Sequence, residues 1–214
     1  MVRAFTVALV LASPLGIATP QTTSSQLWGE LDGYWTPPRY LTPLRFLGTA
    51  AFTRSEEVDV LEATIGLHAI VGDRWGSVRL GMNLTQSLSS EDYREAKIVA
   101  ELNTPATSGR WRFRSRTRLE QRWVLGAPSQ RYRERLRLER QTTLWRRDTI
   151  LAYATYELYY DTRYRALSRS GYRVGVELPL SSRLRLEPSA VRQDNRFGSP
   201  RHVSATAMTI SLLY

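Results

Sequence analysis

The sequence predicts an all-β protein, namely an antiparallel up-and-down transmembrane β-barrel of about 12 strands, with 10 strands as the alternative. Charged and apolar residues alternate along the chain with a period of two, and most of the alternating segments are 10–14 residues long and joined by short turns. Strands of soluble proteins are usually about 5–6 residues long, whereas a tilted strand that crosses a bilayer needs about 9–11. Segment length therefore favours the membrane.

The alternation is clearest in residues 110–124. Arginine recurs there at every second residue from Arg110 to Arg118, while Trp111, Phe113, Leu119 and Trp123 lie in the opposite phase of the segment. On an α-helix a step of two residues turns about 200° and would scatter the arginines over every face. Residues 130–141 repeat the arrangement, with Arg131, Arg133, Arg135, Arg137 and Glu139 opposite Tyr132, Leu136 and Leu138. Each segment is predicted to be a strand with one charged and one apolar face.

Nine further segments show the same alternation: residues 26–35, 44–54, 58–71, 75–88, 93–103, 149–161, 172–178, 183–193 and 203–214. The phase slips at Val60 and Leu61, which predicts a β-bulge, and residues 105–109 are predicted to be a turn. The total is eleven strands, but single-chain bacterial barrels have an even number. Either one more strand lies near Val60 or within residues 163–170, or the first strand stands outside the closed sheet.

The N-terminus has the features of a secretory signal peptide. Arg3 supplies a positive charge, residues 4–12 are apolar, and Gly16 and Ala18 are the small residues that a signal peptidase requires. We expect cleavage after Ala18, so that residues 1–18 form the signal and residues 19–214 the barrel. The expected location is the bacterial outer membrane.

The formal net charge of +10 favours a negatively charged partner, which includes nucleic acid, lipid phosphate and small anions. A single-strand nucleic-acid groove interleaves basic and aromatic side chains on one surface, whereas strand alternation places Arg112 and Trp111 on opposite faces. Export also disfavours nucleic acid. The chain has no cysteine, and its sequence contains no glycine-rich phosphate loop, metal-ligand cluster or close catalytic carboxylate pair. We therefore expect no cofactor, no metal and no enzymatic activity.

The charged faces are predicted to line the lumen. Three segments, residues 116–120, 135–139 and 183–187, carry the pattern Arg-x-Arg-Leu-Glu, which provides two positive charges for each negative one. Ion pairs could brace the lumen, and a surplus of positive charge could attract small anions. The predicted lumenal residues are Arg112, Arg114, Arg116, Arg118, Glu120, Arg122, Arg133, Arg135, Arg137, Glu139, Glu157, Arg173, Glu177, Arg183, Arg185 and Glu187.

Aromatic residues are predicted to form girdles at the membrane surfaces. Trp111 and Trp123 share a phase twelve residues apart, which at a rise of about 3.3 Å and a tilt of about 40° corresponds to roughly 30 Å along the membrane normal. Outer-membrane barrels have an apolar band about 25 Å tall between such girdles. Tyr214 closes the last strand as a terminal aromatic residue, and this strand is expected to be read by the barrel assembly machinery.

The C-terminal half resembles a family of proteobacterial outer-membrane barrels, the domain-of-unknown-function family 2490. The resemblance lies in residues 116–122, 132–138, 156–160, 172–176, 179–182, 186–188 and 202–203. It implies a signal peptide, an outer-membrane location and a monomeric barrel, and it implies no known substrate or catalysis. This chain has Ser168-Arg-Ser-Gly171 where the family usually has Asp-Gln-Asn-Arg.

The leading functional interpretation is a non-catalytic barrel, either a narrow anion-biased pore or a closed structural or assembly-linked protein. An outer-membrane lipid hydrolase is one alternative, since such barrels can carry a serine, a histidine and an acid on the lipid-facing wall; the two histidines are His68 and His202. A soluble periplasmic β-sandwich or lipocalin-like carrier is the other, with its apolar face turned inward.

Overall fold

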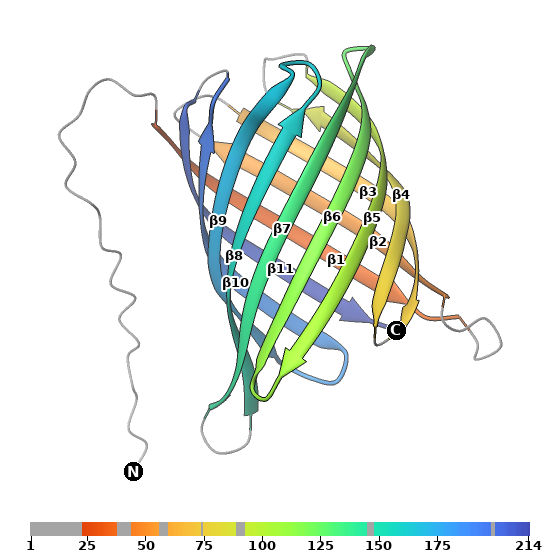
Figure 1. The fold of residues 1–214 in the computed structure, drawn as a ribbon, viewed down its shortest axis with the longest axis vertical. Coiled ribbons are helices and arrows are strands. Elements are labelled where there is room, and N and C mark those ends of the chain that lie inside the picture. The colour runs from red at the N-terminus through yellow and green to blue at the C-terminus, as the bar shows by residue number, and fades with distance from the viewer. Residues whose placement is uncertain are drawn as a thin grey trace.

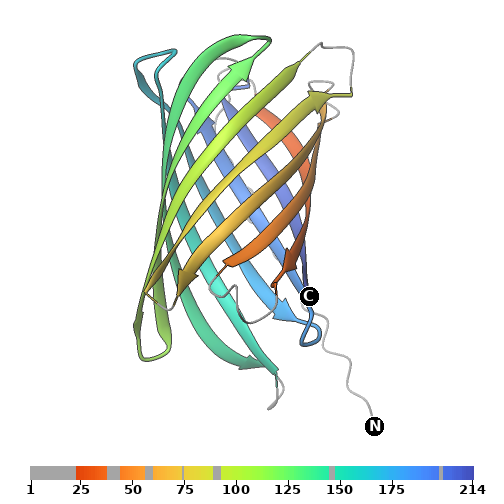
Figure 2. The ribbon, with the colours of Figure 1, turned by 90° about the vertical axis from the view of Figure 1, so that its right-hand side faces the viewer.

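The computed structural model describes residues 23–37, 44–55, 60–73, 75–88, 93–144, 148–197 and 200–214. The predicted signal peptide and its cleavage site lie outside these ranges. The described residues form eleven strands: β1 (Thr23–Trp35), β2 (Leu44–Ser55), β3 (Val60–Asp73), β4 (Gly76–Ser87), β5 (Arg94–Ser108), β6 (Trp111–Val124), β7 (Ala127–Leu144), β8 (Asp148–Asp161), β9 (Ala166–Pro179), β10 (Leu184–Asn195) and β11 (His202–Leu213). The strands tilt around a single closed cylinder (Figures 1 and 2). Across these ranges, no helix is long and apolar enough to span a membrane.

The sheet closes between its first and last strands. Every consecutive pair of strands is antiparallel, and β1 pairs with β11 in parallel, from Thr23 opposite His202 to Tyr34 opposite Leu213. Parallel closure follows from the odd strand number, because the first and eleventh strands of an up-and-down meander run in the same direction. The first strand therefore does not stand outside the sheet, and the described residues contain no additional strand that would make the number even. Residues 166–170, considered for that strand, begin β9.

Two local predictions were wrong. The register of β2 and β3 runs without interruption from Ser55 opposite Val60, so there is no bulge at Val60. A register shift occurs instead between β8 and β9 at Tyr159 and Tyr160, where Ser168 is the extra residue. Most of the turn predicted at residues 105–109 is still strand, because β5 continues to Ser108 and Pro105 pairs with Arg114, so that the turn lies at Gly109 and Arg110. A proline in a strand lacks an N–H donor but keeps an extended backbone.

The connection between β6 and β7 is a two-residue turn. Leu125 and Gly126 both have positive φ angles, 51° and 83°. Positive φ at both central residues defines the type I′ turn, whose twist matches that of a hairpin. Gly126 adopts this conformation without strain, whereas Leu125 brings its Cβ close to the backbone.

Polarity is distributed in the opposite way to that of a water-soluble protein. On the outer wall Leu67 is 63% exposed and Val174 57%, whereas Glu120 and Glu139 are fully enclosed inside the barrel. The alternation along each strand produces this division, because successive side chains point to opposite faces of a sheet. The core of the molecule is thus its lumen, and it is polar.

Candidate functional site: a charged lumen

The arginines of β6 and β7 project into the barrel. Arg116 Nη2 on β6 lies 2.9 Å from Glu157 Oε1 on β8, and Arg137 Nη1 on β7 lies 3.4 Å from Glu187 Oε1 on β10. In each pair the two strands are not neighbours in the sheet. Such contacts form only through the interior, so these side chains cross the lumen.

Six of these side chains form a closed ring of alternating charge. Arg133 Nη1 and Nη2 lie 2.8 Å from Glu120 and 3.0 Å from Glu157. Arg116 joins Glu157, at 2.9 Å, to Glu101, at 3.6 Å. Arg118 completes the ring, 2.5 Å from Glu101 and 3.5 Å from Glu120. Each carboxylate in the ring contacts at least two guanidinium groups, so no acid of the ring is unpaired.

The network extends toward the end of the barrel at which β1 begins, called here the Thr23 end. Arg131 lies 3.8 Å from Glu120 and 3.3 Å from Asp161, and Arg122 lies 2.9 Å from Asp161 and also contacts Glu95. Tyr93, immediately before β5, donates a hydrogen bond of 2.9 Å to Glu95. Burial, reinforced by the neighbouring Glu95 charge, raises the pKa of Tyr93 to about 12, so this hydroxyl is a neutral donor at physiological pH.

A second cluster lies toward the opposite end, called here the Tyr214 end. Glu139 contacts Arg114, lies 2.7 Å from Arg137 and is 3.6 Å from Arg112. Arg137 also reaches Glu177 and Glu187, at 3.8 and 3.4 Å, and its guanidinium lies 3.7 Å from the centre of the Tyr153 ring. Buried ion pairs are stable only when each charge has several partners, and this sharing provides them.

The structure brings nearly all the predicted lumenal residues together. Inward-facing positions hold Arg112, Arg114, Arg116, Arg118, Glu120, Arg122, Arg133, Arg135, Arg137, Glu139, Glu157, Arg173, Glu177, Arg185 and Glu187. Arg183 is the exception, since it lies exposed in the bend before β10. The third Arg-x-Arg-Leu-Glu segment begins before the strand, at a position where alternation does not fix the direction of the Arg183 side chain.

Sequence reasoning omitted several members of the network. Glu95 and Glu101 share the polar phase of β5, yet only the register of β5 against β6 reveals that they face Arg122 and Arg118. Arg131 belongs to the same alternating run as Arg133. Asp161 is the last residue of β8, so alternation alone gave little sign of its pairing with Arg122.

His68 is buried in the lumen beside a cation. Its Nε2 lies 3.0 Å from Arg79 Nη2, and only 1% of its surface is exposed. The ring lies against Gly66 and Gly81, where an added Cβ would approach His68 to 2.9 and 2.1 Å. The glycines therefore create the space that the histidine fills, and His68 has no access to the outer wall.

His202 has a different environment, on the outer wall near the Thr23 end. Its Nδ1 lies 2.7 Å from Asp194 Oδ1, and the two residues are paired across β10 and β11. Ser204 follows on the same face of β11. In the described part of the chain, no group of three or more histidine, aspartate or glutamate side chains is arranged to hold a metal ion.

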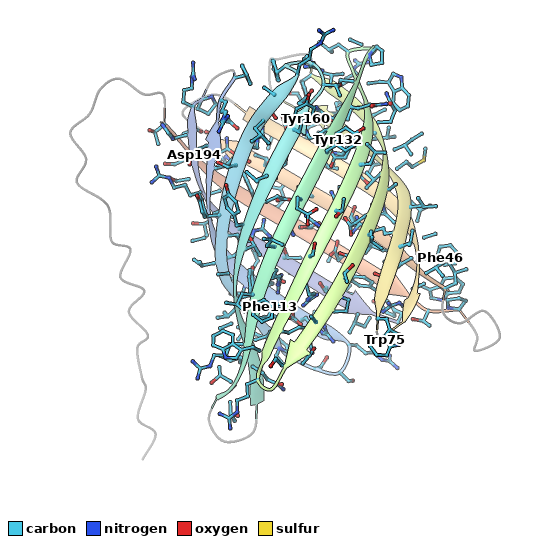
Figure 3. The ribbon with its side chains drawn as sticks, viewed as in Figure 1. Phe46, Trp75, Phe113, Tyr132, Tyr160 and Asp194 are labelled. Atoms are coloured by element: carbon cyan, nitrogen blue, oxygen red, sulfur yellow. The ribbon has the colours of Figure 1, made fainter. Side chains whose placement is uncertain are left out.

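Aromatic side chains gather on the outer wall near both ends. Tyr132 and Tyr160, with ring centres 6.3 Å apart, lie near the Thr23 end, and Phe113 and Trp75 near the Tyr214 end (Figure 3). Trp123 and Trp111, at opposite ends of β6, are both exposed, and Arg140 stacks over Trp111 at 5.2 Å. Tyr214 follows β11 and donates its N–H to Tyr34 O.

The comparisons with known proteins give one family. The family described as "Protein of unknown function (DUF2490)" matches residues 49–202, more than half of the 214-residue chain. No curated protein and no solved structure gave a match. The matched range contains most of the charged ring together with the strands that carry it. The chain belongs to the DUF2490 family.

Proposed function

We propose that the protein is an outer-membrane β-barrel whose braced, charge-filled lumen forms a narrow passage with a preference for anions. One observation supports the membrane location: a closed barrel presents a largely apolar outer wall and buries most of its charges inside. Leu80 and Met82 on β4 are 57% and 56% exposed, and Leu136 on β7 is 56% exposed. Water would strongly disfavour such a wall, whereas the hydrocarbon core of a bilayer requires it.

Three further features support this location. The aromatic side chains near both ends suit the two membrane–water interfaces. Closure between β1 and β11 satisfies the backbone groups that lipid cannot hydrogen-bond. The last strand directs Met208, Ile210 and Leu212 to the outer wall and ends beside Tyr214, a pattern suited to recognition by the barrel assembly machinery. The continuous closure of one chain suits a monomer.

The anion preference rests on unequal charge within the lumen. The carboxylates of the ring are shared by several guanidinium groups, and the β9 arginines Arg169 and Arg173 have no carboxylate partner among the residues that the structure describes. A surplus of fixed positive charge in a low-dielectric enclosure attracts anions and repels cations. The crossing arginines narrow the passage, so we expect low conductance and small solutes.

Membrane fractionation tests the location. The mature protein should remain with outer membranes after carbonate and high-salt washes and should migrate faster on gels when unheated, because a closed barrel has no free edge from which to unfold. An outer-membrane protein of known behaviour and a soluble periplasmic protein are the controls. Recovery of the folded protein in the soluble fraction would reject the proposal.

A lipid hydrolase is a second candidate, favoured by the His202–Asp194 pair on the outer wall. With Nδ1 held by Asp194 at 2.7 Å, Nε2 is free to accept a proton from a serine such as Ser204. Hydrolysis of phospholipid vesicles by the purified barrel, abolished by His202→Ala and retained by His68→Ala, would favour this function over a non-catalytic one. A lipocalin-like carrier has less support, because its apolar side chains would have to face inward.

A further inference from the structure

Two small cavities in the lumen meet at Trp28 and Arg173. One, of about 90 Å³, is lined by Arg133, Arg135, Thr155, Glu157 and Gln193 among others. The second, of about 110 Å³, lies against β1, β2 and β11 and includes Glu30, Thr53 and Thr209 in its wall. Each has room for several water-sized groups. Arg173 and Trp28 belong to both linings, so Arg173 stands at the junction of the two spaces.

Arg173 is not neutralised. It projects from β9 between Thr155 of β8 and Val191 of β10. Its guanidinium makes no ion pair or hydrogen bond with any residue of the described ranges, although most other arginines of the lumen do. Arg173 is half-buried. A guanidinium has five donors and is always charged, so one that faces a lumenal cavity without a protein acceptor favours the entry of an acceptor.

The 90 Å³ cavity is also basic as a whole. Its wall contains three arginines, Arg133, Arg135 and Arg173, and one carboxylate, Glu157. That carboxylate is already shared, at 3.0 Å from Arg133 and 3.1 Å from Arg135. The Nε atoms of both arginines are buried without a hydrogen-bond partner. Donors therefore exceed acceptors around this space.

We propose that this cavity is a binding site for one small oxyanion, of the phosphate or short-chain carboxylate class, held by Arg173. Oxygens of such an anion match the forked donors of a guanidinium. The hydroxyl of Thr155 and the second N–H of the Gln193 amide, whose other N–H is donated to Asn195 at 3.1 Å, supply neutral donors in the same wall. The small volume excludes larger solutes. The indole of Trp28 forms an apolar wall, and its N–H is already donated to Gln26 at 2.7 Å.

The inference deepens the proposed function, because it gives the anion preference of the lumen a location. Arg169, the other arginine of β9, stacks on Tyr159 at 5.3 Å and likewise has no carboxylate partner within the described ranges. It lies nearer the Thr23 end of the strand. Arg169 and Arg173 thus form two successive positive positions on a path from that end to the cavity.

Titration calorimetry of the refolded, heat-modifiable barrel in detergent tests the site, with inorganic phosphate and acetate as probes and chloride keeping the ionic strength constant. We expect saturable binding of one phosphate per barrel. Arg173→Gln should weaken it roughly ten- to a hundredfold, the range for losing hydrogen bonds to a charged group. The matched control is Arg185→Gln, since Arg185 pairs with Glu177 at 3.0 Å near the opposite end.

Glu30 provides the opposing variant. Its carboxylate lies in the wall of the 110 Å³ cavity, where its negative charge disfavours a bound anion, so Glu30→Gln should strengthen phosphate binding. Unsaturable binding, or equal affinity in wild type and Arg173→Gln, would overturn the site. Arg173→Lys keeps the positive charge but loses the forked donors of the guanidinium, and it serves as a second test variant if Arg173→Gln fails to fold. Phosphate binding is measured in detergent and is therefore independent of the membrane location. Absence of phosphate binding would reject the site but not the outer-membrane location, and recovery in the soluble fraction would reject the location but not the site.

Discussion

Arg133 Nη1 lies 2.8 Å from Glu120 Oε1 inside the lumen. Glu120 is fully enclosed, and it also lies near Arg118 and Arg131, at 3.5 and 3.8 Å. Glu120 thus neutralises part of the charge of three arginines. Each of these arginines also pairs with a second carboxylate. The result is a cross-linked polar core that ties β5, β6, β7 and β8 together.

Removing the central acid should be costly. Glu120→Gln leaves three buried guanidinium groups without their shared counter-charge, and breaking one partner of a buried pair typically costs about 3–5 kcal/mol. Urea unfolding in detergent, followed by the heat-modifiable gel shift, measures the loss. Glu177→Gln is the control, because Glu177 also pairs with two arginines but lies in a partly exposed position, and it should cost less than about 1 kcal/mol. Equal costs would show that the ring is not cooperative.

The facing of the outer wall gives a second prediction. Leu119→Arg, in the middle of β6, should cost about 2–4 kcal/mol and impair assembly if that wall meets lipid. Leu180→Arg introduces the same charge on an exposed leucine in the turn before β10, outside the apolar band, and should be neutral. If both variants assemble equally well, the outer wall faces water.

An outward carboxylate interrupts the apolar wall. Glu134 on β7 accepts hydrogen bonds of 2.6 Å from Ser115 and from Thr117 of β6. Charged groups facing lipid are destabilising, and Glu less so than Arg or Lys. Glu134→Gln should therefore stabilise the barrel in lipid bilayers by about 1 kcal/mol while leaving unfolding in aqueous detergent nearly unchanged. Destabilisation in bilayers would indicate that another protein surface covers this wall.

The β6–β7 turn offers a test of backbone strain. Leu125 adopts a φ of 51°, which costs a residue with a Cβ roughly 1–2 kcal/mol. Leu125→Asn, a residue suited to this turn type, should raise stability by about 1 kcal/mol without changing the lumen. Leu180→Asn serves as the control for loss of an exposed leucine. No gain would mean that contacts of the Leu125 side chain offset its strain.

Ion selectivity should depend on the unpaired arginines of β9. In planar bilayers we expect small conductance with anions favoured. Arg169→Glu combined with Arg173→Glu should reverse the preference, since these residues have no carboxylate partner within the described ranges. Arg116→Glu should instead impair assembly, because it breaks the ring at two acids. If the unaltered protein conducts cations in preference to anions, the proposed anion-selective pore is wrong. If it conducts no ions in the bilayer, bracing of the barrel remains as the role of the ion-pair network.

Several parts of the fold were predictable because they depend on local periodicity. Alternation along residues 110–124 placed Trp111 and Arg112 on opposite faces, and the structure has them so. The boundaries were less predictable, since Pro105 reads locally as a turn residue but pairs within β5. The bulge was also misplaced, because the register shift at Ser168 depends on the approach of β8 and β9 rather than on the phase of one strand.

The sequence by itself determined that the chain forms strands with one charged and one apolar face, because a period of two is a property of the backbone and needs no partner strand. It therefore also determined which residues of one strand share a face. Only the tertiary structure decided which acid meets which arginine and how the sheet closes. The pairing of Arg116 with Glu157 across an intervening strand, and the parallel contact of β1 with β11, both depend on register and curvature around the whole barrel. Those quantities are set by all the strands together, and so is the position of Arg173 between two cavities, where it makes no ion pair with a described residue.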